Sequence, residues 1–479
     1  MIDIDIKKID LTKKLTYGIL FCVLSIICFC VLWKANWLYG GSLWGDDYLF
    51  LMTTAIGKAA HGCTWDGRFY PLGHSDYSIL LLVPYGKTAI AHYIYNCVIL
   101  VASSLIIFSF LKKVTKKNYA VSLFSLLILF SVSSFMQIHM ECFYPEKTLS
   151  FLLCVFMWSY KKAEKTDKFP YYFLTFVVAA YATYMKEPVF GIFAIIAVTE
   201  LLFDDLSQKS KFLNYALIFN SVVFVAIYVY RRLFRTYTGI YASVSSNISD
   251  LSFSLFVNEP ILYFIVGLTL FRLYFLLIKK DREHIFTDAL LFASTGYAFA
   301  YFLLRLDHSY YLFPSVVLFL PAFAVFIAES KCFVKILSVI ISISCVVPQF
   351  ACNKYAVLNV WDHREKDHLF FEHIVDEYHA GKKIYWLSDP LLEKNDPGYS
   401  KLDNVMFLDR FQHFLNYYST HQIIIERIFD LSNIDDKCVV LCSCTTAAGR
   451  SFDKTRKELE KRGLTQTMSL VGHLMFSKK

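Results

Sequence analysis

Long apolar runs separated by short polar segments fill the first 350 residues of the chain. A helix needs about 20 apolar residues to cross a bilayer. On this template we place about eleven spans, near 15–33, 90–111, 119–138, 148–160, 171–185, 188–203, 212–230, 260–278, 286–304, 310–328 and 333–350. The runs at 148–160 and 171–185 are short, so either their boundaries lie further out or these helices end in protein. The pattern predicts an all-α polytopic membrane protein.

The pattern changes after about residue 351, where charged residues become frequent and apolar residues alternate with polar ones. Alternation indicates strands, and a period of 3.6 indicates helices. The expected elements are helices at His368–His379 and Ser451–Arg462 and strands at Lys383–Leu387, Val405–Leu408 and Cys438–Cys442. We therefore predict a membrane domain over 1–350 and a small soluble α/β domain over 351–479.

Composition supports the membrane interpretation. Hydrophobic residues make up 56% of the 479 residues and the mean hydropathy is +0.45, whereas soluble proteins contain roughly 45–50% apolar residues. The net charge of +8 comes from lysines and arginines that cluster between the apolar runs. This placement follows the positive-inside rule, so we expect contact with membrane lipids and no binding of nucleic acid.

The basic clusters also predict an orientation. Lysines precede the first span, which has no cleavage site after it and is expected to stay uncleaved. Placing the N-terminus in the cytoplasm makes every inner loop basic: Lys112 to Lys117, Lys161 to Lys168, Lys209 to Lys211, Lys279 to Arg282, and Lys331. The outer loops are then 34–76, 139–147, 186–187, 231–259 and 305–309, and the C-terminal domain is extracytoplasmic. The short apolar piece at 78–84 is expected to be re-entrant or interfacial, which extends the first outer loop to 34–89.

The first outer loop is the densest polar stretch of the membrane half. It contains Trp44-Gly45-Asp46-Asp47-Tyr48, then His61, Trp65-Asp66-Gly67-Arg68-Phe69-Tyr70-Pro71, His74 and Asp76. Two adjacent carboxylates at a membrane face must be solvated, paired or bound to a cation. This loop is therefore the predicted working surface.

The order of a first span, Asp46-Asp47-Tyr48, and Gly67-Arg68 about twenty residues later resembles GT-C glycosyltransferases, and within them the bacterial O-antigen glucosyltransferase-like group. The resemblance covers the membrane portion. It implies a multi-pass protein of the bacterial inner (plasma) membrane that works on the cell envelope, for example on lipopolysaccharide. It also implies a polyprenyl-phosphate-linked sugar donor, a glycan or lipid-linked acceptor, an acidic catalytic residue in the first outer loop, and inversion at the sugar carbon.

This chemistry needs a base and positive charge. A carboxylate can take the proton of the acceptor hydroxyl, so Asp46 and Asp47 are the expected catalytic residues. The family pattern favours Asp46 as the base and Asp47 as its partner. Either carboxylate could also hold a divalent cation, Mg²⁺ or Mn²⁺, that shares the charge of the leaving phosphate.

The remaining predicted contacts lie in the later outer loops. The expected substrate-binding residues are Arg68, Glu141, Glu146, Lys186, Glu187, Arg305, His308 and Tyr310. Arginine suits a phosphate through its planar fork. Two of these residues also have a structural alternative. Arg68 could pair with Asp66, and Lys186 could pair with its neighbour Glu187.

Three other functions stay open. A flippase or transporter of lipid-linked glycans would place ionisable residues at mid-membrane depth, where these spans are plain apolar. A polymerase or ligase of surface polysaccharide would use a larger outer loop with arginines, such as 231–259 with Arg231 and Arg232. A structural or sensory role would make the C-terminal domain the working part.

Overall fold

The structure is a computed structural model in which the described residues are 2–35, 69–80, 82, 89–141, 144–234, 256–257, 259–304, 306, 308–387, 412, 415–416, 422–428, 431–432, 434–443, 452–470 and 473–478. The chain divides into two compact units. The helical unit comprises the described residues of 1–31, 61–76 and 94–357, and the α/β unit comprises those of 32–60, 77–93 and 358–479. The predicted boundaries at 1–350 and 351–479 stay a prediction.

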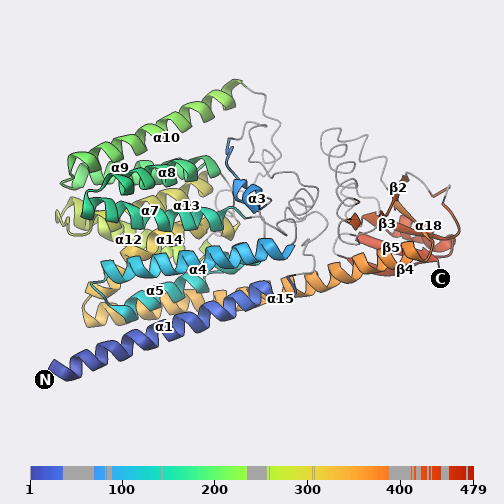
Figure 1. The fold of residues 1–479 in the computed structure, drawn as a ribbon, viewed down its shortest axis with the longest axis horizontal. Helices are drawn as coiled ribbons and strands as arrows, with labels where there is room; N and C mark the ends of the chain where they lie inside the picture. Colours follow the sequence, from blue (N-terminus) through green and yellow to red (C-terminus); the bar gives the residue numbers. More distant parts are fainter. Residues whose placement is uncertain are drawn as a thin grey trace. The chain divides into compact units, whose positions relative to one another are not determined.

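Helices dominate the structure (Figure 1). They are α1 Ile2–Leu32, α3 Ser75–Leu80, α4 Ala89–Val114, α5 Tyr119–Ser131, α6 Ser133–Met140, α7 Glu146–Thr166, α8 Phe169–Met185, α9 Val189–Phe203, α10 Gln208–Phe234, α12 Ile261–Leu277, α13 Ile285–Leu303, the 3-10 turn η2 Ser309–Leu312, α14 Phe313–Glu329 and α15 Cys332–His379. Every apolar run predicted as a span coincides with one of these helices or, at 119–138, with the pair α5–α6.

Within the described residues, six helices are long and apolar enough to cross a membrane, or seven when the bent pair α5–α6 counts as one span. The helices α8, α9 and α12 have 17, 15 and 17 residues, which is at or below the lower limit of about 17 for a span. The predicted fold class, a polytopic helical membrane protein with a small α/β domain, is confirmed. The count of eleven spans stays a prediction.

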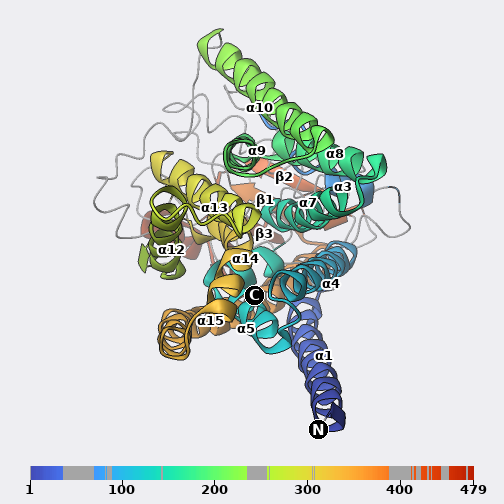
Figure 2. The same ribbon diagram turned by 90° about the vertical axis from the view of Figure 1, so that its left-hand side faces the viewer.

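The helix α14 forms the centre of the helical unit, and Figure 2 shows it from the end with α5, α7 and α13 around it. Its side chains are buried along nearly the whole length, including Pro321 inside the helix. By contrast, α1 exposes large apolar side chains such as Leu15, Phe21 and Phe29. Such residues suit a lipid environment, because a lipid-facing helix gains nothing from a polar surface.

The connections gather at two ends of the helical unit. One end, here called the basic end, carries the connections 115–118, 167–168, 204–207, 278–284 and 330–331, and it lies at the left in Figure 1. The opposite end, here called the loop end, carries residues 69–76, 141, 144–145, 186–188, 306 and 308. The predicted inner and outer loops are thus separated as expected, while the side of the membrane that each end faces stays a prediction.

The run 119–138, which the sequence predicts as one span, is bent by 65° between α5 and α6. At the bend Val132 is extended, with φ −68° and ψ 146°. Its freed backbone groups are bound by side chains of distant segments: Asn353 donates to the Val132 carbonyl at 3.3 Å, and the Ser133 amide donates to Gln349 at 3.0 Å. Glu259 accepts from the Ser133 hydroxyl at 2.9 Å. A bend inside a bilayer requires such partners.

The predicted span at 333–350 and the predicted helix His368–His379 are parts of one helix, α15, of 48 residues. The link between them, 351–367, contains no glycine and no proline. Without a helix-breaking residue the backbone continues its hydrogen bonds through the link.

The α/β unit has a five-stranded sheet in the order β2-β1-β3-β5-β4. The strands are β1 Lys383–Leu387, β2 Ile425–Ile428, β3 Cys438–Ser443, β4 Leu464–Leu470 and β5 His473–Lys478, and α18 is Phe452–Lys461. β1 pairs in parallel with β2 and β3, and β5 pairs antiparallel with β3 and β4. The predictions of β1, β3 and α18 are confirmed, β2, β4 and β5 were not predicted, and Val405–Leu408 lies outside the described residues.

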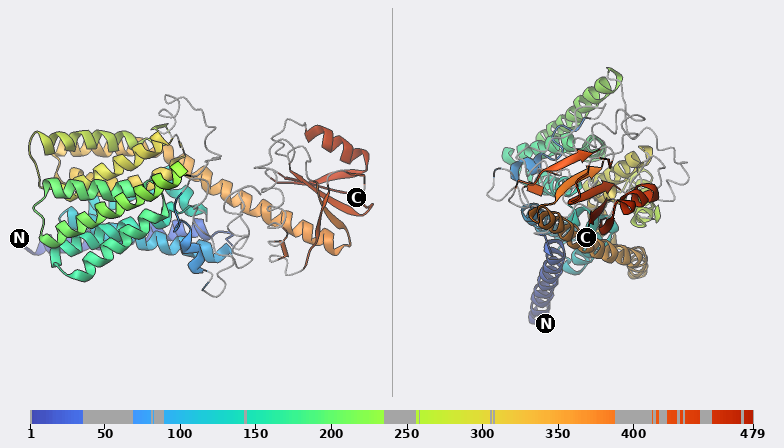
Figure 3. Two further views of the ribbon diagram at one scale, coloured as in Figure 1. Left: turned by 90° about the horizontal axis from the view of Figure 1, so that it is seen from above. Right: turned by 90° about the vertical axis from the view of Figure 1, so that its right-hand side faces the viewer.

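Alternation along β1 gives the sheet two buried faces. Ile384 and Trp386 pack with Phe370 of α15, and Tyr385 packs with Leu459 of α18. Figure 3 shows α18 and the end of α15 on opposite faces of the sheet. Because both faces are covered there, the central strands β1 and β3 are apolar at most positions.

Candidate functional site at the loop end

Six of the predicted substrate-binding residues belong to the described part of the chain and all lie at the loop end: Glu141, Glu146, Lys186, Glu187, His308 and Tyr310. The predicted catalytic and metal-binding residues Asp46 and Asp47 lie outside the described residues, as do Arg68 and Arg305. The roles of those four residues stay predictions.

The centre of the loop end is a buried ion pair. Glu146 is the first residue of α7 and is 0% exposed, and its Oε1 accepts from Lys186 Nζ at 2.6 Å. Lys186 follows the end of α8, and its ammonium group lies 4.7 Å from the centre of the Tyr311 ring. Glu146 Oε2 has no hydrogen-bond partner among the described residues. Removing either charge would leave the other buried and uncompensated.

Lys186 therefore binds a carboxylate 40 positions away in the sequence, in addition to any contact with its neighbour Glu187. The predicted polar loop 139–147 is also different in the structure. Lys147 is 1% exposed because α7 begins at Glu146. Its Nζ donates to the backbone carbonyl of Glu141 at 3.1 Å, and Asn96 Nδ2 donates to the same carbonyl at 3.1 Å. The turn is thus held by its backbone.

A second carboxylate lies close to the first along α7. Asp76, at the start of α3, is 4% exposed. Its Oδ2 accepts from the Thr148 hydroxyl at 2.6 Å and from the Tyr95 hydroxyl at 3.1 Å, and its Oδ1 has no partner among the described residues. Thr148 is two residues after Glu146. The two acidic groups therefore share one helix end.

Sequence reasoning noted Asp76 as part of the dense first loop but assigned it no role, and it missed Tyr95 and Thr148. Both residues lie inside or beside apolar runs, where a hydroxyl looks like a minor interruption. The position of Thr148 could have indicated its role, because it lies in the first helical turn after Glu146.

Aromatic rings form one wall of the loop end. Tyr310 lies between Tyr144, at a centroid distance of 4.2 Å, and Tyr311, at 4.1 Å. Tyr311 stacks on Tyr301 at 4.7 Å, and the exposed His308 ring is parallel to Tyr310 within 11°. These contacts bring Tyr144 of the predicted outer loop 139–147 and His308 of the predicted outer loop 305–309 onto the same tyrosine, Tyr310.

Arg231 belongs to the end of α10, which continues to Phe234, and not to the start of an outer loop as predicted. Its guanidinium lies 5.3 Å from the centre of the Phe69 ring. Phe69 in turn contacts Tyr184 at 6.0 Å. The aromatic face offsets part of the cost of holding the arginine at this depth.

An apolar cavity of about 290 Å³ lies between α12, α13 and η2. Its lining includes Phe256, Leu262, Phe299, Phe302 and Leu312. Phe256 precedes α12, and the other four come from the half of these elements nearest the loop end.

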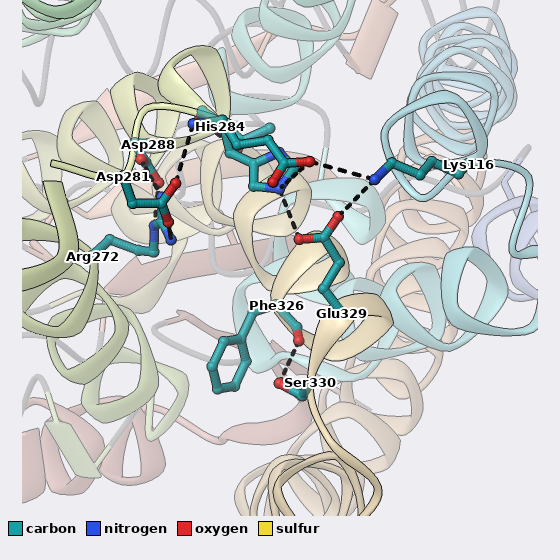
Figure 4. A network of polar contacts seen from close by, with 10 residues as sticks. Lys116, Arg272, Asp281, His284, Asp288, Phe326, Glu329 and Ser330 are labelled. Carbon is teal, nitrogen blue, oxygen red and sulfur yellow. Dashed lines mark hydrogen bonds and ion pairs between the residues drawn. The ribbon is translucent and has the colours of Figure 1, made fainter. Parts of the chain in front are cut away.

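The basic end is organised differently (Figure 4). Arg272 donates to both oxygens of Asp288 at 2.8 Å and to Asp281 at 3.0 Å, and His284 contacts Glu329 at 2.7 Å. Burial alone would raise the pKa of Asp281, but hydrogen bonds from the Glu283 amide and Arg272 lower it overall. A cavity of about 460 Å³ opens beside this network.

Two groups of side chains in the described part of the chain could hold a metal ion, and both lie at the basic end. They are Glu283, His284 and Glu329, and Glu164, Glu200 and Asp204. Neither includes the residues predicted to bind a metal at the first outer loop.

The fold and the loop end together define a class of protein, a polytopic helical membrane protein with polar chemistry gathered at one end and a small α/β unit. A solved structure shows the same fold: ArnT from Cupriavidus metallidurans bound to undecaprenyl phosphate, with a TM-score of 0.50, 10% identity, and coverage of 96% of this chain and 98% of that chain. The chain is also similar to the oligosaccharyltransferase of Archaeoglobus fulgidus tethered with an acceptor peptide, with a TM-score of 0.44 and 12% identity over 85% of this chain and 64% of that chain.

No protein-family model and no curated protein sequence matches the chain. At 10% identity the likeness to ArnT concerns the fold. The GT-C-like architecture expected from the resemblance is therefore confirmed as a fold.

Proposed function

We propose that the protein is a membrane glycosyltransferase of the GT-C type. It transfers a sugar from a polyprenyl-phosphate donor to a surface glycan or lipid-linked acceptor, with inversion at the sugar carbon. One observation carries the proposal: residues from separate predicted outer loops meet at the loop end, where Glu146 holds Lys186 beside the Tyr311 ring. The fold shared with ArnT, which is bound to a polyprenyl phosphate, supports the same donor class.

The reaction assigns a task to each group. Asp46, with Asp47 as its partner, takes the proton of the acceptor hydroxyl as the oxygen attacks the anomeric carbon. The bond between that carbon and the phosphate oxygen breaks, and its electron pair leaves with the polyprenyl phosphate. The phosphate is a weak base and needs no general acid. A Mg²⁺ or Mn²⁺ ion at Asp46 and Asp47 would add a positive charge near the phosphate.

Lys186 is the described cation best placed for that phosphate. Its partner Glu146 fixes the direction of the ammonium group at 2.6 Å. Arg68, Arg305 and His308 are the further phosphate or sugar contacts that we propose. Tyr310 and the exposed ring of His308 parallel to it would contact the sugar, and the apolar cavity of about 290 Å³ would offer room to isoprene units next to the phosphate.

In this proposal the loop end faces outward from the bacterial inner membrane. The N-terminus is then cytoplasmic and the α/β unit extracytoplasmic. An O-antigen or another part of the lipopolysaccharide is the acceptor class that the sequence resemblance favours.

The test is sugar transfer in membranes that contain Asp46→Asn or Asp47→Asn, with Asp205→Asn as the control. Asp205 is an exposed carboxylate at the basic end. We expect loss of transfer in at least one of the first two variants and unchanged transfer in the control, at equal expression. Full activity in both Asp46→Asn and Asp47→Asn would contradict the proposal. Products that carry many sugar units would instead indicate a polymerase, and movement of lipid-linked glycan without transfer would indicate a flippase.

A further inference from the structure

Three carboxylates meet where α7 and α9 end, at the basic end of the helical unit. Glu164 comes from the last turns of α7, Glu200 from the last turn of α9, and Asp204 from the residue after α9. One oxygen of each lies within 4.8 Å of those of the others. Glu200 is 0% exposed.

One oxygen of Glu200 is satisfied and the other is not. Asn214 Nδ2 donates to the Tyr160 hydroxyl at 2.9 Å, so the single hydroxyl proton of Tyr160 is free to go to Glu200 Oε2 at 3.2 Å. Glu200 Oε1 has no hydrogen-bond partner in the part of the chain that the structure describes. A buried carboxylate oxygen without a partner is costly unless something binds it.

The second group of possible ligands at the basic end provides a contrast. Glu283 and Glu329 are 65% and 38% exposed, so water can reach them, and Lys116 lies between them at 3.5 and 3.3 Å. That group already contains a cation. The first group also has a cation beside it, because Lys161 pairs with Glu164 at 2.6 Å, but among the described residues nothing donates to Glu200 Oε1.

We infer that Glu164, Glu200 and Asp204 form a binding site for a divalent cation of the hard, oxygen-preferring kind, Mg²⁺ or Ca²⁺. These ions bind carboxylate oxygens at about 2.0–2.1 Å and about 2.3–2.6 Å respectively, so oxygens on opposite sides of one ion lie roughly 4–5 Å apart. The three carboxylates meet that limit, and water completes the coordination. The ion joins the ends of α7 and α9. This inference goes beyond the proposed sugar transfer and does not depend on it.

The experiment uses Tb³⁺ as a luminescent substitute for the ion on the purified full chain in detergent. Tyr160, which contacts Glu200, is a suitable sensitiser of Tb³⁺ emission. Asp46 and Asp47 are both replaced by Asn in every sample, so that the first outer loop contributes no signal. We expect sensitised emission that added Ca²⁺ or Mg²⁺ displaces, and the concentration of each ion needed identifies the preferred one.

Glu200→Gln is expected to abolish this emission, and the matched control Asp205→Asn, an exposed carboxylate next to the group, is expected to keep it. Lys161→Gln is expected to tighten binding because it removes a competing positive charge. A melting-temperature rise on adding the preferred ion should accompany binding and be absent from Glu200→Gln. If Glu200→Gln fails to fold, Glu164→Gln replaces it. Equal Tb³⁺ emission in the parent and in the folded variant would overturn the inference, whatever the transfer assay shows.

Discussion

Two buried ion pairs, one at each end of the helical unit, are almost equally buried. They differ in how many oxygens of the carboxylate have a hydrogen-bond partner. In the loop-end pair Lys186 is 12% and Glu146 0% exposed, and in the basic-end pair Arg272 is 13% and Asp288 1% exposed. The arginine binds both oxygens of its aspartate. The lysine binds one oxygen of its glutamate, and the other is unpaired among the described residues. A carboxylate with both oxygens paired suits a structural role, whereas the remaining oxygen of Glu146 can still accept a hydrogen bond from a ligand group such as a sugar hydroxyl.

The largest expected effect is on sugar transfer, which should depend on the loop-end ion pair and not on the basic-end ion pair. Lys186→Met and Arg272→Met each leave a buried carboxylate without its cation, so each should lower the free energy of unfolding by about 3–5 kcal/mol. Transfer per folded molecule should fall about 10- to 150-fold in Lys186→Met, because a charge-assisted contact to phosphate contributes about 1.5–3 kcal/mol. It should stay near the parent value in Arg272→Met.

The measurement is thermal unfolding and transfer on the same purified samples. The double variant Glu146→Met with Lys186→Met serves as the control, because it removes both charges and should regain stability without activity. Restored transfer in that double variant would show that the loop-end pair is structural after all, and the contrast between the two ends would disappear.

An intermediate effect is expected from the second loop-end carboxylate. Thr148→Val removes the 2.6 Å hydrogen bond to Asp76 without changing the side-chain shape. A buried hydrogen bond to a charged group contributes about 1.5–3 kcal/mol, so the melting temperature should fall clearly. Thr166→Val, at the basic end of the same helix, loses only a hydrogen bond to a backbone carbonyl, so its melting temperature should fall less. Equal shifts would show that the Asp76 contact is not special.

The smallest effect extends the comparison to an exposed pair in the α/β unit. Asp435 and Lys383 lie 2.8 Å apart and are about half exposed. The hydrogen bond from Lys383 lowers the pKa of Asp435. Its contribution to stability is therefore present above the unfolded pKa of about 3.9 and is lost as the pH falls through the lower folded value. Amide exchange of β1 in the full chain should rise slightly more with acid in the parent than in Asp435→Asn. An identical acid response would mean that the pair contributes nothing measurable.

The periodicity of apolar residues predicted where the helices lie and which connections share an end, because both follow from local composition and from alternation of direction. It could not predict which charges pair. Lys186 has Glu187 beside it in the sequence, yet its bond to Glu146 depends on how α7 and α8 pack. The bend at Val132 was missed for the same reason, since the groups that stabilise it, Gln349 and Asn353, are more than 200 positions away.

Several strands of the sheet were harder to predict from the sequence than the charge pairs. β2, with four residues, and the β4–β5 hairpin carry polar residues at many positions, so their alternation is weak in the sequence. Asp46 and Asp47, on which the catalytic prediction depends, were found from their spacing and resemblance to a family, and the assays above are what test them.

The direction of the helices around Lys186 adds an electrostatic consequence of its own. α7 begins at Glu146, α9 at Val189 and α14 at Phe313, so the amino-terminal ends of three helices point toward the loop end. Peptide dipoles give each such end a partial positive charge of roughly half a unit. The carboxyl-terminal ends of α8 and α13 also point this way and carry the opposite charge, so an anion is favoured where it lies against one of the three amino-terminal ends; unlike a histidine or a carboxylate, this backbone charge does not titrate. Phosphate recognition at this end would therefore keep part of its strength across the whole pH range in which the helices remain folded.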